Sequence, residues 1–169
     1  MLIGNKIIFL DIDGVLCVIP YRFDEWGGDF HEHFVDNLRR IINETGAKIV
    51  ISSSWKGSGL KSLQNMWKSR NLPGEVVDIT PFADEVVKRS PNLTYYDDVI
   101  RGDEIRLWIE LHIPDLTDYV IIDDDDDMLP HQIPHFVKTS GNYNHPDKVD
   151  IGYGLTDECT DNVIRILNG

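Results

Sequence analysis

The sequence feature that most constrains the fold is a set of three short apolar runs that each end in polar residues. The runs are KIIFLDID at residues 6–13, KIVISSS at residues 48–54 and YVIIDDD at residues 119–125. Apolar residues occupy successive positions in each run, so both faces of the predicted strand are buried, as in a parallel sheet. The polar residues therefore stand at the carboxyl ends of strands, where ligands bind in sheets of this kind.

Segments with helical spacing of apolar residues separate these runs. Residues 32–45 form one such segment, and Gly46 follows them, which is typical of a helix C-terminus. Further helices are expected over residues 59–71 and 101–112 and after Thr156, and further short strands over residues 76–79 and 135–138. This alternation predicts an α/β fold, a three-layer sandwich with a mostly parallel central sheet.

The composition predicts one globular domain over residues 1–169. Its 169 residues and 41% hydrophobic content suit a single core, and residues 17–31 are expected to form a small flap. No apolar stretch approaches the roughly 18 residues of a membrane span, and no signal peptide is recognised, so a cytoplasmic location is expected. Cys17 and Cys159 form no C-x-x-C pair and predict neither a zinc site nor a disulfide framework.

The net charge limits the partners. The chain has 16 basic and 29 acidic residues, which gives 16 − 29 = −13. Such a chain repels an extended nucleic-acid backbone at long range, although it tolerates one phosphate held beside a metal ion.

The carboxylates after the first and third runs predict a metal site. Residues two apart in a strand point the same way, so Asp11 and Asp13 are aimed at one place, and Gly14 permits a tight turn behind them. Asp123 and Asp124 bring the number of carboxylates to four. Because such charges repel one another, a hard divalent cation such as Mg²⁺ is expected between them. A carboxylate there is also a potential nucleophile.

These motifs resemble those of a known superfamily. The stretch Asp11-Ile12-Asp13-Gly14-Val15 resembles the first motif of the haloacid dehalogenase (HAD) superfamily of phosphohydrolases, KIVISSS its second and YVIIDDD its fourth. The chain is most similar to the small HAD domain associated with Swiss-army-knife RNA repair proteins. There, TGAKIVISSSW, an RG-x-EI-x-x-W helix and VIIDDDxDM occur in this order. The resemblance covers roughly residues 5–168. Members of the superfamily often carry a cap domain as a large insert after the first or second strand; residues 17–31 hold only a small flap and residues 71–100 lack clear repeated structure, so an essentially capless domain is expected.

The resemblance implies specific roles at the strand ends. Asp11 would be the nucleophile that forms an aspartyl-phosphate, and Asp13 the general acid and then the base. Asp11, Asp13, Asp123 and Asp124 would hold Mg²⁺, with Asp127 as an outer ligand.

Two further roles have alternatives. Ser53 would bind a phosphoryl oxygen, and its neighbours Ser52 and Ser54 remain open for that role. Arg101 would supply the positive charge of the site, with Lys88 and Arg89 as alternatives.

The function implied is a Mg²⁺-dependent phosphomonoester hydrolase. Its partner would be either a nucleotide or other small phosphomonoester, or the terminal phosphate of a nucleic acid. Two other functions stay open: a non-catalytic module that binds phosphate or metal, and a phosphotransferase that uses the same residues. The paired histidines His31 and His33, and likewise His131 and His135, lack a third ligand in the sequence, which disfavours a transition-metal site.

Overall fold

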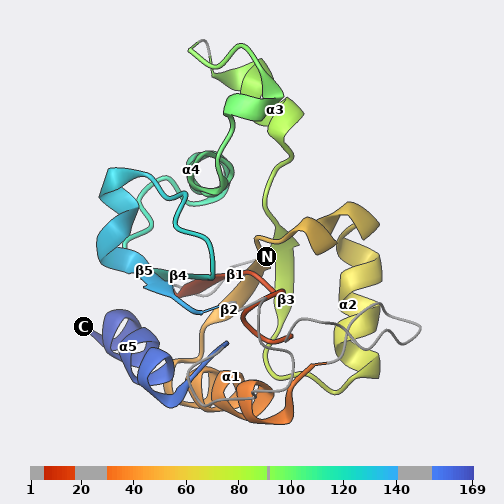
Figure 1. The fold of residues 1–169 in the computed structure, drawn as a ribbon, viewed down its shortest axis with the longest axis vertical. Coiled ribbons are helices and arrows are strands. Elements are labelled where there is room, and N and C mark those ends of the chain that lie inside the picture. The colour runs from red at the N-terminus through yellow and green to blue at the C-terminus, as the bar shows by residue number, and fades with distance from the viewer. Residues whose placement is uncertain (1–5, 18–29, 91, 141–153) are drawn as a thin grey trace.

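A five-stranded parallel sheet organises the molecule (Figure 1). The computed structural model describes residues 6–17, 30–90, 92–140 and 154–169. The strands are β1 (Ile7–Leu10), β2 (Lys48–Ile51), β3 (Val76–Ile79), β4 (Tyr119–Asp123) and β5 (Phe136–Lys138). The helices are α1 (Glu32–Thr45), α2 (Leu60–Ser69), α3 (Ala83–Arg89), α4 (Arg101–His112) and α5 (Asp157–Asn168). The described residues also include the 3₁₀ helices η1 (Ser54–Ser58), η2 (Tyr96–Asp98) and η3 (Pro130–His135).

The strand order is β3-β2-β1-β4-β5, and all neighbouring strands pair in parallel. β1 is central: Leu10 lies opposite Ile51 on one side and Ile122 on the other. All three strand-final polar segments therefore meet at one edge of the sheet, which confirms the predicted α/β fold class.

The two faces of the sheet have separate cores because side chains alternate along each strand. Ile8 and Leu10 pack with α1, α2 and α5, whereas Ile7 and Phe9 pack with α4. Figure 1 shows α1 and α5 on one side of the sheet and α4 on the other, which gives the three predicted layers. On the α4 side, Trp108 is completely buried and meets the Phe9 ring edge-on.

Helix ends follow the local sequence. Gly46 has φ 67° after α1, and its N–H donates to the carbonyl of Ile42. The side chain of Thr156 accepts a hydrogen bond from the N–H of Cys159 at 3.2 Å and caps α5. Both predicted helix boundaries are therefore found.

The stretch between β3 and α4 contains a helix, α3, that the sequence pattern does not reveal. Only Val86 of its seven residues is buried, so its apolar spacing is too sparse to recognise. Figure 1 shows α3 projecting beyond α4, away from the sheet. The predicted flap over residues 17–31 lies mostly outside the described residues, since only its two ends are described. None of the described helices is both long and apolar enough to cross a bilayer.

Candidate active site

The site is assembled by backbone pairing at the carboxyl ends of β1, β2 and β4. The N–H of Asp11 donates to the carbonyl of Ile122 at 2.9 Å, so the residue after β1 is held against β4. On the other side, the N–H of Ser52 donates to the carbonyl of Leu10 at 2.9 Å. The same hydrogen bonding that builds the sheet thus fixes the starting points of the polar side chains.

Three of the four predicted metal ligands lie together. Asp11, Asp123 and Asp124 each offer an oxygen, and these oxygens lie within 4.8 Å of one another. Gly14 makes the approach possible, because a Cβ there would overlap the Asp124 carboxylate. Its φ of +74° also favours glycine. Among the described residues this is the one group of three or more acidic, histidine or cysteine side chains close enough to share an ion.

The carboxylates are buried and titrate abnormally. Asp11 is 7% exposed and Asp123 is 2% exposed. Burial, reinforced by the charge of Asp123, raises the pKa of Asp11 to about 8. Burial also raises the pKa of Asp123 to about 7. A pair of carboxylates that resists ionisation near neutral pH is expected where a cation or a positive group normally balances the charge.

Asp13 lies beside this cluster but is not part of it. Its Oδ2 accepts a hydrogen bond from the indole Nε1 of Trp55 at 3.0 Å. Trp55 follows β2, so a residue after β2 orients Asp13, which follows β1. The edge of the Trp55 ring faces Phe30, with ring centroids 5.8 Å apart. The Asp13 side chain is therefore held in place by a packed aromatic neighbour.

The three serines after β2 differ in their surroundings. Ser53 is completely buried, and its hydroxyl hydrogen-bonds to the Asp11 carboxylate, which opposes the burial-driven rise in the Asp11 pKa. Ser52 is also buried, and its hydroxyl has no hydrogen-bond partner among the described residues. Ser54 begins η1 and is exposed. The geometry favours Ser53 as the serine nearest the reacting group.

Arg101 reaches the cluster from the first residue of α4. Its Nε lies 3.6 Å from Oδ2 of Asp123, and its Nη1 lies 3.1 Å from Oε2 of Glu104. Burial opposes its charge, but Glu104 and Asp123 outweigh burial and raise the pKa of the guanidinium. The alternative cation Lys88 instead pairs with Asp84 on the exposed surface of α3 at 3.0 Å, and Arg89 ends the same helix.

Asp127, the predicted outer ligand, lies at the start of α4. Its Oδ2 accepts a hydrogen bond from the backbone N–H of Arg101 at 3.0 Å, and its carbonyl accepts from the N–H of Gly102 at 3.1 Å. These bonds satisfy N–H groups that would otherwise be orphaned at the start of α4. Asp127 thus holds the helix start, and hence Arg101, against the loop that carries Asp123 and Asp124.

Comparison with known proteins agrees with this arrangement. The family model described as "HAD domain in Swiss Army Knife RNA repair proteins" matches residues 7–144, which is more than half of the chain. The chain belongs to this HAD family. No curated protein and no solved structure matches it. Membership indicates the phosphohydrolase superfamily, and the matched span includes the ends of β1, β2 and β4 and the start of α4.

The donor set of this HAD domain suits Mg²⁺, the ion that the family implies. All ligand atoms in the cluster are carboxylate oxygens, the donors that a hard divalent cation prefers. Moreover, Oδ2 of Asp123 is buried and accepts no hydrogen bond from any described residue. A buried carboxylate oxygen normally has such a donor, and Arg101 Nε, at 3.6 Å, forms an ion pair but not a hydrogen bond, so a metal ion suits this oxygen as a further partner.

The HAD domain also contains a buried cation that the sequence pattern does not single out. Lys56, in η1, is 5% exposed. Its Nζ lies 2.7 Å from Oε2 of Glu104, the carboxylate that also contacts Arg101. A lysine beside a serine-rich strand end is unremarkable in sequence, and only its depth in the fold distinguishes it. The one available signal is its position directly after KIVISSSW.

Proposed function

We propose that this HAD domain is a Mg²⁺-dependent phosphomonoester hydrolase that works through an aspartyl-phosphate on Asp11. The observation that carries the proposal is the placement of Asp11. It is buried at the carboxyl end of the central strand, within 4.8 Å of two further carboxylates, and it is hydrogen-bonded to Ser53. Arg101 stands within 3.6 Å of one of those carboxylates. One nucleophile is thus surrounded by groups that bind a metal ion and a phosphoryl group.

In the proposed reaction, a carboxylate oxygen of Asp11 attacks phosphorus, and the bond from phosphorus to the ester oxygen breaks. Asp13 donates a proton to the departing oxygen. Asp13 then accepts a proton from water, which attacks the same phosphorus, releases phosphate and regenerates Asp11. The hydrogen bond from Trp55 keeps the Asp13 carboxyl in one orientation for both proton transfers.

Asp11, Asp123 and Asp124 would hold the metal ion, and the contribution of Asp13 to the metal site stays a proposal. Mg²⁺ would supply positive charge that neutralises the carboxylates and the phosphoryl oxygens. Arg101 contributes a permanent positive charge from the chain itself. Ser53 is placed to donate a hydrogen bond to a phosphoryl oxygen once that oxygen replaces its contact with Asp11.

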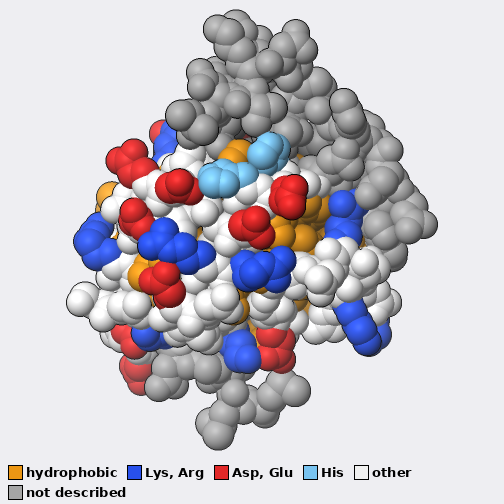
Figure 2. Space-filling view, turned by 90° about the horizontal axis from the view of Figure 1, so that it is seen from below, with side chains coloured by type: hydrophobic (Ala, Val, Ile, Leu, Met, Phe, Trp, Pro, Cys, Tyr) orange, Lys and Arg blue, Asp and Glu red, His pale blue; other side chains and the backbone are white. Residues whose placement is uncertain are grey.

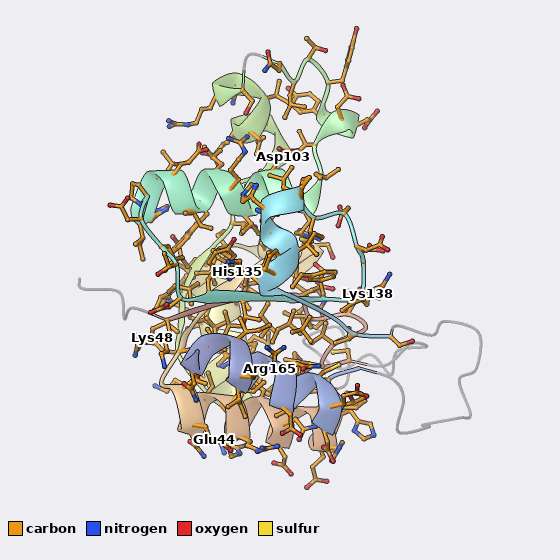
Figure 3. The ribbon with its side chains drawn as sticks, turned by 90° about the vertical axis from the view of Figure 1, so that its left-hand side faces the viewer. Glu44, Lys48, Asp103, His135, Lys138 and Arg165 are labelled. Atoms are coloured by element: carbon orange, nitrogen blue, oxygen red, sulfur yellow. The ribbon has the colours of Figure 1, made fainter. Side chains whose placement is uncertain are left out.

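A cavity beside the site favours a leaving group larger than a simple alcohol. It has a volume of about 1080 Å³, and Asp124, Lys138 and Arg165 are among its lining residues. Figure 3 labels Lys138 at the carboxyl end of β5 and Arg165 on α5, and both residues line the cavity. Pockets for small molecules and cofactors are typically about 300–1,000 Å³, so this cavity has room for more than a phosphate group. We therefore propose a nucleotide or the terminal nucleotide of a nucleic acid as the phosphate donor.

The nucleic-acid end is the branch that the family favours, because its description refers to RNA repair proteins. The net charge of −13 argues for contacts to an end and against a long backbone track. Turnover of an oligonucleotide phosphate should accordingly depend only weakly on salt.

The test is release of phosphate from a panel of substrates with and without Mg²⁺. The panel contains nitrophenyl phosphate, nucleotides, sugar phosphates and oligonucleotides that carry a 3′ or 5′ phosphate. We expect metal-dependent release, lost in Asp11→Asn, with nucleotides or oligonucleotide ends as the best substrates. No release from any of these by a folded, Mg²⁺-binding protein would contradict the proposal and favour a binding module. Transfer to added alcohols in place of water would favour a phosphotransferase.

A further inference from the structure

We infer that Lys56 offsets the charge of Glu104 and so leaves Arg101 in position to face Asp123, which makes Lys56 a positioning residue that controls activity without touching the substrate. The inference rests on the proposed function of the site and adds to it a residue outside the HAD motifs described above. It concerns a line of charges in which Lys56 contacts Glu104, Glu104 contacts Arg101 and Arg101 faces Asp123.

Lys56 is anchored firmly by three neighbours. Its Nζ donates to Oγ1 of Thr80 at 3.2 Å and to the carbonyl of Pro81 at 2.8 Å, in addition to its contact with Glu104. Three acceptors match the three donors of an ammonium group, so its hydrogen bonding is complete. These acceptors come from the end of β3 and from α4, while Lys56 follows β2. The ammonium therefore ties three elements together directly behind the site.

Glu104 is shared between two cations. The same oxygen, Oε2, lies 2.7 Å from Nζ of Lys56 and 3.1 Å from Nη1 of Arg101. The Glu104 side chain is only 11% exposed, so solvent screens these contacts weakly. Lys56 neutralises much of the charge of Glu104. The positive charge of Arg101 is therefore not fully offset by Glu104, and it can attract Asp123 and an incoming phosphoryl group.

Removal of Lys56 should change this balance. The full charge of Glu104 would then fall on Arg101 and draw the guanidinium away from Asp123. Loss of a supporting partner of this kind typically costs about 10- to 100-fold in activity. We expect Lys56→Met to lower kcat by about that factor, with a smaller change in KM, because Lys56 makes no contact with the substrate.

The double variant Lys56→Met, Glu104→Gln separates positioning from other roles. It removes both charges, so it leaves no unpaired buried ion, and Arg101 is again free to face Asp123. We expect the double variant to recover most of the kcat that the single variant loses. The matched control is Lys48→Met, which breaks the exposed Lys48–Glu75 pair at the opposite edge of the sheet, where Figure 3 labels Lys48, and should leave kcat unchanged.

The experiment compares kcat, KM and thermal stability of these variants with the best phosphomonoester and Mg²⁺, together with crystal structures that give the distance from Arg101 Nε to Asp123 Oδ2. Lengthening of this distance in Lys56→Met and its return in the double variant would support the inference. A double variant that folds but stays as slow as the single variant would overturn it, as would an unchanged kcat in folded Lys56→Met. If the wild type itself hydrolyses nothing, the proposed function fails, and the Arg101 distances alone decide the inference.

Discussion

Charged side chains gather in two regions of this molecule whose surroundings differ. At the carboxyl edge of the sheet, Asp123 is 2% exposed and Arg101 approaches it only to 3.6 Å. On the face formed by α1 and α5, Arg40 contacts Glu44 and Asp161 at 2.8 Å each, but all three side chains are about half exposed or more. Figure 2 shows acidic and basic side chains intermingled over that face.

The comparison indicates that burial, more than the distance between partners, determines how strongly charged groups affect each other in this molecule. The pairs on α1 and α5 are shorter, yet water and salt screen them, so each contributes little to stability. The Arg101–Asp123 pair at the sheet edge is longer, at 3.6 Å, yet desolvation there raises the pKa of Asp11 and Asp123 far above ordinary values. The predictions below alter each region in turn, from the largest expected effect to the smallest.

The largest effect is expected from Asp11→Asn. An amide is a poor nucleophile toward phosphorus, so kcat should fall by about 10³-fold or more. The surface variant Asp161→Asn, which makes the same chemical change on α5, is the control and should retain full activity. Phosphate release per folded protein measures both. Substantial activity in Asp11→Asn would mean that another group attacks phosphorus.

Asp13→Asn should have the next largest effect. It preserves the shape of the side chain and its place beside Trp55 but removes the proton that the leaving group needs. A loss of about 10²- to 10⁴-fold is typical for a general acid and base. The loss should be smaller for nitrophenyl phosphate, whose leaving group needs little protonation, than for a nucleotide. Equal losses for both substrates would argue against this role.

The stability of the metal-free protein should fall as pH rises. The pKa of Asp11 is raised to about 8 and that of Asp123 to about 7, so between about pH 4 and pH 8 the folded chain binds more protons than the unfolded chain. The stabilisation present at low pH is therefore lost as these carboxyls ionise. Mg²⁺ should restore stability, and more so at pH 8 than at pH 5, because it binds the ionised form.

Thermal melting with EDTA and with Mg²⁺, at pH 5 and pH 8, measures this effect. Asp11→Asn is the comparison, because it removes one of the two shifted carboxyls and should flatten the pH dependence. Identical profiles for wild type and variant, or no response of either to Mg²⁺, would mean that the cluster is not a metal site.

The smallest effect is expected from Arg40→Ala on the α1–α5 face. Both of its ion pairs are solvent-exposed, and such pairs contribute little to stability because water and salt screen them. The melting temperature should change little, and the small change should shrink further at high salt. Denaturant unfolding at low and high salt provides the measurement. A loss of unfolding free energy as large as that of a core substitution would show that the exposed pairs are not weaker than the buried ones.

The sequence predicts the parts of this fold that depend on local pattern. The strands, Gly46 after α1 and Thr156 before α5 follow from the spacing of apolar and capping residues. The meeting of Asp11, Asp123 and Asp124 follows as well, because parallel strands bring their carboxyl ends to one edge.

Other features depend on tertiary contacts that no local pattern encodes. Lys56 is distinguished only by its burial against Glu104, a residue on α4 that is far from Lys56 in the sequence. In the sequence, Trp55 cannot be distinguished from an aromatic residue that only packs beside the sheet. The structure shows that its Nε1 donates a hydrogen bond to Asp13. Asp127 belongs to an acidic run in which each member looks alike, and only the fold turns it toward the start of α4. The role of each of these side chains follows from its position in the fold and not from its residue type.

The central claim is that Asp11 carries the phosphoryl group during turnover. The most direct test mixes the protein with its best phosphomonoester and Mg²⁺, quenches in acid within one turnover, and locates phosphorylation by mass spectrometry of peptides. The account predicts one phosphoryl group on the peptide that contains Asp11, absent from Asp11→Asn, and more abundant in Asp13→Asn when nitrophenyl phosphate, whose leaving group needs little protonation, is the substrate. Turnover by the wild type with no phosphoryl group on that peptide at any quench time, in either the wild type or Asp13→Asn, would contradict it.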